Sequence, residues 1–448
     1  MGGRTRGLLA VLVVAQVLTV ANANMIAVAL PPLADDLGAS ETQQQWIVDA
    51  YVLVFAALLV AGGVFGDRFG RRRALTGGLV LFAGGSLACA LSPGPGVLIA
   101  ARVVQGLAPP LVLPASLAIV ATSHPDRIAR SRAIGIWGAG SGFGVAIGPL
   151  LGGLIVTALG WRWVFGLSAP AALLLAAATV RVVPGDLASA VRDRFDLAGA
   201  ALVTAGMAGV VFGIIEGRER GWTSPAVVGA FAVGAALLAA FVAVERRHPA
   251  PLVDLALLRR RRFAVANLGG ATVMFALLGT TVYLSAFLQR VQHLTALQTG
   301  LALLPIGGAT AVLAPIAGRS TAKVSARTLM AAGMLCSCAG ALLLSRIEPG
   351  DGALDLLPAL VLLGAGIGVA LPAMTSTAVS AAPAPQTGMA SAVHNASRQL
   401  GATLGVAVLG SIVFAGASLA DGLRVAFLVA GALLAVAAAS ALVLVPRR

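Results

Sequence analysis

Residues 63–73 read Gly-Val-Phe-Gly-Asp-Arg-Phe-Gly-Arg-Arg-Arg and separate two long apolar runs of the chain. Glycine allows a tight turn because it has no Cβ to restrict the backbone. Arginines directly after an apolar run are typical of a cytoplasmic loop in a membrane protein. Topology alone requires neither an acid at position 67 nor a glycine at position 70, so we expect a charge cluster that holds one conformation of a helical bundle and breaks in another. Its members are Gly63, Asp67, Arg68, Gly70, Arg71 and Arg72.

The composition of the whole chain is that of a membrane protein. Of its 448 residues 58% are hydrophobic and only 11% are charged, and its mean hydropathy is +0.95. A soluble globule of this size needs more polar surface. The net charge of +14 does not indicate nucleic-acid binding, because the arginines lie in short loops between apolar runs and not on one face of a soluble domain.

Fourteen stretches are long and apolar enough to cross a bilayer. They lack the alternation of β-strands, so they are expected to be helices, which satisfy their own backbone hydrogen bonds in lipid. They are centred in residues 7–30, 46–66, 74–92, 97–121, 133–157, 163–183, 197–216, 225–244, 263–288, 299–318, 328–345, 355–378, 396–417 and 422–445.

The basic residues decide the orientation. An even number of crossings puts both termini on one side of the membrane, and most of the 31 Lys and Arg residues fall in loops on that side. Because loops rich in Lys and Arg face the cytoplasm, we expect both termini to be cytoplasmic. The sequence therefore predicts a multi-pass protein of the cell inner (plasma) membrane, whose inner charge faces anionic membrane lipids.

The longest segments between the expected helices bracket two of them. These segments, residues 184–196 and 245–262, divide the chain into an amino-terminal six-helix bundle (1–184), a two-helix insert with cytoplasmic linkers (185–262) and a carboxy-terminal six-helix bundle (263–448). Two related six-helix halves are a common plan of transporters. The expected fold is therefore an all-α polytopic membrane protein of 14 transmembrane helices.

Three motifs resemble one family. The turn at 63–73 resembles the loop G-x-x-x-D-R-x-G-R-R of the major facilitator superfamily, and the resemblance covers nearly the whole chain. Residues 98–106, with Arg102 and Gln105, look like the family's helix-4 motif, in which a buried arginine is associated with proton coupling. Residues 144–153 match the helix-5 motif of the family's antiporters, which implies export. That motif is carried by Gly144, Gly148, Pro149, Gly152 and Gly153.

Further segments are similar to the 14-helix branch of quaternary-ammonium and multidrug exporters. They are residues 45–51, 161–165, 283–289, 388–392 and 398–401. The resemblance implies a proton-coupled exporter (antiporter) of lipophilic, often cationic small molecules that works by alternating access. It also implies a monomer that needs no cofactor. The glycines and proline of the helix-5 motif serve either close packing or hinging, because both need the same residue types.

One residue departs from the pattern of that branch. Asn22 stands where many members carry an intramembrane aspartate, and an amide does not titrate in the working range. Apart from acids at the terminal residue of a span, Asp49 is the only acid within a predicted span, and some quaternary-ammonium exporters are similar in having an acid there. We hypothesise that Asp49 binds a proton or a cationic substrate, tuned electrostatically by Arg102 at similar depth. The alternative is that Asp49 lies near the outer interface, reaches water and takes no part.

The second half has no acid within a predicted span, so a cavity between the halves would be apolar with scattered amides and hydroxyls. Such a surface suits lipophilic compounds. These polar side chains could equally hold helices together. The candidates are Asn22, Asn24, Tyr51, Gln105, Asn267, Tyr283, Gln289 and Asn395.

Nothing in the sequence indicates an enzyme, a metal site or a nucleotide site. The four histidines, His124, His248, His293 and His394, fall in expected loops or at helix ends without metal-ligand spacing, and no phosphate-binding loop is present. Alternatives to drug export are export of an endogenous metabolite or antibiotic, uptake by a symporter of the same fold, or a transport-dead sensor or lipid-handling protein.

Overall fold

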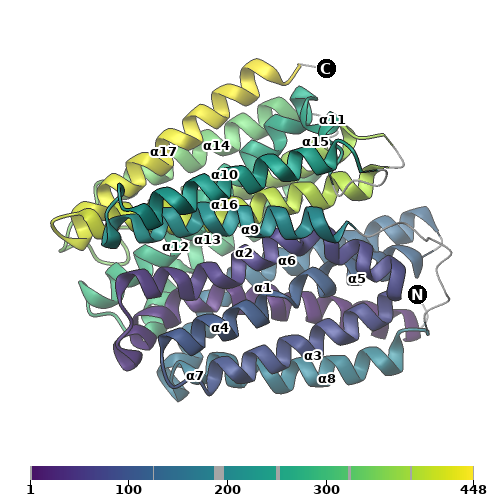
Figure 1. Ribbon diagram of the computed structural model, residues 1–448, viewed down its shortest axis with the longest axis horizontal. Helices are drawn as coiled ribbons and strands as arrows, with labels where there is room; N and C mark the ends of the chain where they lie inside the picture. Colours follow the sequence, from purple (N-terminus) through teal and green to yellow (C-terminus); the bar gives the residue numbers. More distant parts are fainter. Residues whose placement is uncertain are drawn as a thin grey trace.

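The computed structural model describes residues 3–124, 126–185, 196–248, 253–320, 324–383 and 386–446, and within these ranges it contains helices and no strand. The long helices run nearly parallel in one bundle (Figure 1). Helix α1 begins and helix α17 ends at the same end of this bundle (Figure 1), as an even number of crossings requires. This is called the terminus end below, and it is the end that the basic loops predict to be cytoplasmic.

The amino-terminal half is built from the first eight helices. They are α1 (Gly3–Leu37), α2 (Glu41–Phe69), α3 (Arg71–Ala90), α4 (Pro95–Gly106), α5 (Pro109–Thr122), α6 (Arg127–Leu159), α7 (Arg162–Gly166) and α8 (Ser168–Val182). The expected span 97–121 is interrupted between α4 and α5, where Pro109 and Pro110 cannot donate backbone hydrogen bonds to the preceding turn.

The carboxy-terminal half follows the same plan after a short helix, α11 (Leu255–Leu258). Its helices are α12 (Arg261–Arg290), α13 (Ala296–Ser320), α14 (Ala326–Leu344), α15 (Leu357–Ser380), α16 (Thr387–Ala415) and α17 (Leu419–Leu444). Thirteen described helical stretches are long and apolar enough to cross a membrane. With the 29-residue helix α2 beside them, the described part of the chain has fourteen helical stretches that correspond to the fourteen expected crossings.

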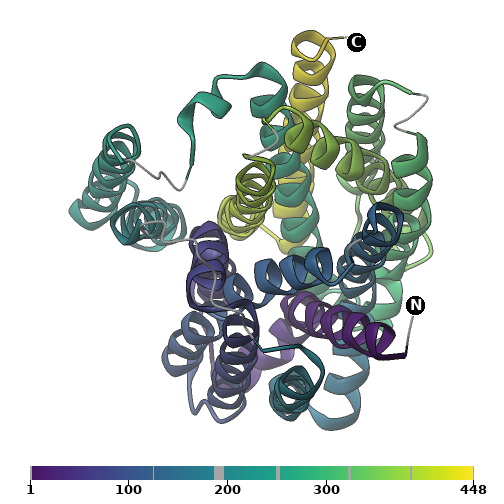
Figure 2. The same ribbon diagram turned by 90° about the vertical axis from the view of Figure 1, so that its right-hand side faces the viewer.

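The two inserted helices, α9 (Leu197–Arg220) and α10 (Pro225–Glu245), form a pair at the side of the bundle (Figure 2). They pack closely through glycines: a Cβ added at Gly209 would stand 2.9 Å from the carbonyl oxygen of Ala230. Helix α9 also contacts α2 and α16, which belong to different halves. The interface between the halves, which runs along α2 and α16 on one side and along α6 and α13 on the other, is called the seam below. The insert therefore covers one edge of this seam.

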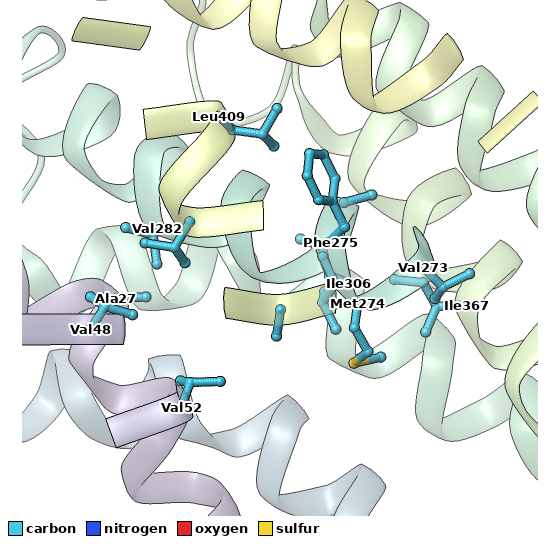
Figure 3. Close-up of a cluster of buried hydrophobic side chains, with 14 of the residues drawn as sticks. Ala27, Val48, Val52, Val273, Met274, Phe275, Val282, Ile306, Ile367 and Leu409 are labelled. Atoms are coloured by element: carbon cyan, nitrogen blue, oxygen red, sulfur yellow. The ribbon is translucent and has the colours of Figure 1, made fainter. Parts of the chain in front are cut away.

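The two halves are joined at the end opposite the termini. Arg290 of α12 lies 3.4 Å from the carboxylate of Asp35 on α1. Gln289 Nε2 donates to the Val28 carbonyl at 3.0 Å, and the backbone N–H of Leu297 donates to Thr157 Oγ1 at 3.1 Å. Below these contacts, buried apolar side chains of both halves form one cluster (Figure 3).

Toward the terminus end the halves separate along α6 and α13. Near the middle of the bundle, a Cβ at Gly307 would collide with Ala146, and one at Gly300 would collide with Pro149. Three turns further along the same face of α13, a Cβ at Gly318 would meet nothing within 4 Å, and the same holds for Gly142 on α6, one turn from Ala146. The two helices therefore diverge, which leaves the halves closed at the predicted outer end and apart at the predicted inner end.

Candidate functional site

Arg102 is fully buried inside the amino-terminal half, and among the described residues it has no acidic partner. Its Nε donates to the Ile47 carbonyl of α2 at 3.0 Å, and Nη1 donates to Gln105 Oε1 at 2.6 Å. Its guanidinium carbon lies 4.3 Å from the centre of the Tyr51 ring and 5.8 Å from that of Phe165. Carbonyl and amide oxygens and aromatic faces thus replace the carboxylate that a buried cation usually requires.

The network around Arg102 uses three of the cavity candidates. Gln105 Nε2 donates to Asn22 Oδ1 at 3.2 Å and to Ser86 Oγ at 2.8 Å. Asn22 Nδ2 donates in turn to Ser168 Oγ at 3.0 Å. Asn22, Tyr51 and Gln105 are all almost completely buried, so in this conformation they hold helices of one half together.

Asp49 is fully buried, and neither carboxylate oxygen has a hydrogen-bond partner in the part of the chain that the structure describes. It lies in the outer half of α2, where this helix packs against α16 and α9. Its neighbours one turn away on the same helix face are Gln45 and Leu53. Leu53 packs with Ala407 of α16 and with Val211 and Ile215 of α9. The carboxyl group therefore lies at the seam between the halves and not at an edge that reaches water.

In this conformation Asp49 and Arg102 are not in direct contact, and the expected electrostatic tuning of Asp49 by Arg102 stays a prediction. Arg102 binds the face of α2 that carries Ile47 and Tyr51. Asp49 is two residues from each of these, and side chains two apart on a helix point in nearly opposite directions. Helix α2 therefore separates the two charges, and no ion pair joins them.

The electrostatic neighbour of Asp49 belongs to the other half. Tyr283 of α12 lies close enough to Asp49 for a direct electrostatic interaction, and it also interacts with Gln45. Its hydroxyl donates to the Val406 carbonyl of α16 at 2.6 Å. A Cβ at Gly410 of α16 would collide with the Tyr283 hydroxyl and the Gln45 amide. Glycine at this position thus permits the close approach of α2, α12 and α16.

The remaining cavity candidates lie apart from this site. Gln289 joins the halves at the outer end through Val28, and the Asn24 side chain donates to the Val20 carbonyl of its own helix at 2.8 Å. Asn267 and Asn395 lie near the terminus end of α12 and α16, and each amide donates to a carbonyl one turn earlier in its own helix.

The position of His394 differs from the expectation that it lies at a solvated helix end. Helix α16 begins at Thr387, nine residues before the expected span, so His394 lies two turns inside it and is fully buried. The polar residues around it interrupt the apolar run, so the sequence predicts a span that begins only at residue 396. His124 is also buried, and its Nδ1 lies 2.9 Å from the Val120 carbonyl. Among the described residues, no cluster of His, Cys, Asp or Glu has the arrangement of a metal site.

Sequence reasoning also missed Glu216, which it placed at the end of a span. Glu216 of α9 is 8% exposed. It accepts a hydrogen bond from Trp46 Nε1 of α2 at 3.2 Å and pairs with Arg220 at 2.6 Å. Because Trp46 precedes Asp49 by one turn, this acid fixes the inserted helix beside the Asp49 seam.

The charged turn between α2 and α3 is formed by a single residue. Gly70 has φ of 105°, a left-handed value that other residues rarely adopt. Arg72 donates to the Val180 carbonyl of α8, and Arg68 lies over the ring of Phe69 at 5.3 Å. The side chain of Asp67 lies outside the described residues. A Cβ at Gly63 would make ordinary contact with Pro114 at 3.6 Å.

The glycines of residues 144–153 allow α6 to lie directly against two helices. A Cβ at Gly144, Gly148 or Gly152 would stand 3.1, 2.7 or 3.0 Å from the nearest atom of Val20, Asn24 or Met25 on α1. A Cβ at Gly153 would collide with the backbone of Ala296 at the start of α13. These glycines therefore serve close packing in this conformation, and Pro149 lies among them where α13 approaches. Hinging stays a prediction.

Comparison with known proteins gives one consistent result. The sequence family described as the Major Facilitator Superfamily matches residues 12–406. The chain is 37% identical over 409 residues to the puromycin resistance protein of Streptomyces alboniger, covering 90% of this chain and 81% of that protein. It is also 37% identical over 394 residues to the multidrug resistance protein Stp of Mycobacterium tuberculosis, covering 88% of this chain and 73% of Stp.

The fold matches solved transporters at lower identity. A bacterial homologue of the human lysosomal transporter Spinster has a TM-score of 0.73 and 16% sequence identity, with 99% of this chain and 97% of that chain covered.

Proposed function

The chain belongs to the Major Facilitator Superfamily, and from this premise we propose that it is a multi-pass membrane transporter that exports drug-like small molecules in exchange for protons. Relatives with 37% identity carry names of puromycin and multidrug resistance, and another, 31% identical, is named a tetracenomycin C resistance and export protein. These names support export of antibiotics, whether taken up from outside or made by the same cell.

Proton coupling rests on Asp49, the one observation that carries the proposal. A carboxylate without hydrogen-bond donors, buried between two halves of a bundle, is strongly disfavoured as an ion. The neutral acid fits the closed seam between α2 and α16, and the ionised form favours a conformation in which the seam opens. Proton binding at Asp49 is thus linked to which side of the membrane the space between the halves opens to.

The size of this effect is sufficient for coupling. A charged aspartate at the centre of a membrane helix costs about 2.5–3.5 kcal/mol on insertion scales. Since each 1.4 kcal/mol is about tenfold, ionisation can change the ratio of the two conformations by about a hundredfold. One proton moving through 100 mV supplies about 2.3 kcal/mol, which supports more than tenfold accumulation of substrate.

The moving units are the amino-terminal half (1–184) and the carboxy-terminal half (263–448), with the insert (185–262) along one edge. Arg102 acts as a positioning residue, because it binds the Ile47 carbonyl and the Tyr51 ring and so fixes the face of α2 behind Asp49. The transporter works as a monomer, with both termini in the cytoplasm and its basic loops against anionic lipids.

The test is ethidium uptake by inverted membrane vesicles from a pump-deficient host, energised by respiration. The wild-type chain accumulates ethidium, and accumulation stops when an uncoupler removes the proton gradient. Asp49→Asn, which keeps the size of the side chain but cannot titrate, loses gradient-driven uptake. Asp421→Asn is the matched control, because Asp421 is half exposed and pairs with Arg424 in the first turn of α17.

Two results would count against this function. Gradient-driven uptake that is equal in wild type and Asp49→Asn removes Asp49 from proton coupling. Absence of uptake by the wild type, for ethidium and for a panel of antibiotics, argues for a transporter of another substrate or a chain that does not transport.

A further inference from the structure

Polar atoms without hydrogen-bond partners gather between α12 and α16 in the carboxy-terminal half. His394 is fully buried, and neither of its ring nitrogens has a partner. Arg398 follows one turn later on α16, and its Nε also has none. A Cβ at Gly270 of α12 would stand 2.8 Å from His394 Cε1 and 3.1 Å from Arg398 Cγ. Glycine at this position therefore lets both side chains enter the space between the helices.

The opposite wall of this space adds another unused acceptor. Asn267 of α12 is 6% exposed, and its Nδ2 donates to the Phe263 carbonyl at 2.7 Å. Its Oδ1 has no partner. Asn267 precedes Gly270 by three residues and so shares its helix face. Together with His394 and Arg398 it defines the cluster, which lies nearer the terminus end than Asp49 does.

Arg398 is poorly compensated by its present neighbours. Its Nη1 donates to Asn395 Oδ1 at 3.3 Å, and its Nη2 lies 4.0 Å from the Met274 sulfur. No ion pair to Arg398 is found in the part of the chain that the structure describes. The carboxylate of Asp254 accepts a hydrogen bond from Gln386 Nε2 at 3.1 Å, and Gln386 lies two turns before His394. A guanidinium keeps its charge inside proteins, so it favours a binding partner of opposite charge.

The export function proposed above is the basis for the next step: we propose that the cluster of Asn267, His394 and Arg398 is a subsite for an anionic oxygen group, above all a carboxylate, on the exported molecule. The Arg398 fork matches the two oxygens of a carboxylate. A ring nitrogen of His394 adds one N–H donor. Because Arg398 is only half-buried and the halves are apart at this end, an amphiphilic acid or a zwitterion reaches the subsite from the predicted inner side. The substrate class thus extends beyond lipophilic cations.

The test compares a carboxylic acid with its own ester. Purified protein in nanodiscs of neutral phosphatidylcholine is titrated with 1-pyrenebutyrate and with its methyl ester, and binding is followed by pyrene anisotropy after subtraction of empty discs. The wild type is expected to bind the acid about tenfold more tightly than the ester, the range of a hydrogen bond between charged groups. Arg398→Gln reduces the affinity for the acid to that for the ester and leaves ester binding unchanged.

Further variants separate a binding role from a structural one. His394→Phe keeps the ring volume, removes one donor and reduces the preference for the acid several-fold. Ester binding by each variant reports that the protein is folded. Arg319→Gln changes the same charge at an exposed position at the terminus end of α13, and it is expected to keep the full preference.

The outcomes distinguish this subsite from the export function. Equal binding of acid and ester by the wild type, no binding of either, or a preference that survives Arg398→Gln overturns the subsite. Displacement of pyrenebutyrate by phosphatidylglycerol added to the discs assigns the cluster to a lipid headgroup and also overturns it. In each of these cases the export function still holds if the wild type exports ethidium. If the wild type prefers the acid but exports nothing, the subsite holds and the export function is wrong.

Discussion

The two faces of helix α2 differ in the partners of the buried charged groups that lie on them. The face of Ile47 and Tyr51 contacts Arg102, whose hydrogen bonds and aromatic contacts all lie within the amino-terminal half. The face of Gln45 and Asp49 lies at the seam with the other half, where the Asp49 carboxyl has no partner. Arg102 is thus held by several groups where helices stay together. Asp49 has no partner where a transport cycle has to change its surroundings.

The same contrast separates Arg102 and Arg398. Arg102 is held by a carbonyl, an amide and two aromatic rings, with only its Nη2 left without a hydrogen-bond partner among the described residues. Arg398 has one long hydrogen bond and a contact with a sulfur atom. The first arrangement is that of a structural residue, whereas the second is suited to receive a ligand.

The largest effect is expected from removing the Arg102 side chain. Arg102→Ala takes away hydrogen bonds to Ile47 and Gln105 and leaves both acceptors buried, which costs about 3 kcal/mol or more. The midpoint of thermal unfolding in detergent should fall by several degrees, while Arg319→Gln leaves it unchanged. An unchanged midpoint in Arg102→Ala would show that this face of α2 does not depend on the arginine.

An intermediate effect is expected at the seam, from two adjacent glycines. Gly307→Ala forces a methyl group into Ala146 where α6 and α13 meet, and such overpacking costs about 1–3 kcal/mol. If the substitution destabilises the conformation that is closed at the outer end by this amount, the rate of ethidium uptake in inverted vesicles drops about fivefold or more. Gly308→Ala, which meets nothing within 4 Å, serves as the control. Equal rates for the two variants would mean that the contact does not limit transport.

The smallest effect is expected at the edge of the seam. Glu216→Gln keeps an oxygen that can accept from Trp46 and loses the pair with Arg220, whose side chain is 53% exposed. Exposed ion pairs contribute about 0–1 kcal/mol, so uptake should change less than twofold. Glu219→Gln, at an exposed position of α9, is the comparison. A loss of transport specific to Glu216→Gln would give the insert a direct part in the cycle.

The fold was predictable because lipid imposes a simple rule on sequence. Each crossing needs about 20 apolar residues, and the expected spans correspond to the helices of the structure. The prediction was wrong at the start of α16, where Ser391, His394 and Asn395 interrupt the apolar run but continue the helix. Such residues are tolerated because they face other helices instead of lipid.

The candidate site was predictable in its members but not in its arrangement. Intramembrane charge alone drew attention to Asp49 and Arg102. Similar depth suggested contact, yet the position of Asp49 two residues from both Ile47 and Tyr51 places it on the other side of α2. That Tyr283, and not Arg102, would face Asp49 depends on how the halves pack, which the sequence of one half does not contain.

The central claim is that Asp49 carries a proton when the outer seam is closed. Infrared difference spectroscopy tests it most directly, because a protonated carboxyl group has a C=O stretching band separate from that of a carboxylate. Substrate addition at constant pH should change this band in the wild type, the band should shift in heavy water, and it should be absent in Asp49→Asn. The same carboxyl band in Asp49→Asn as in the wild type would contradict the account.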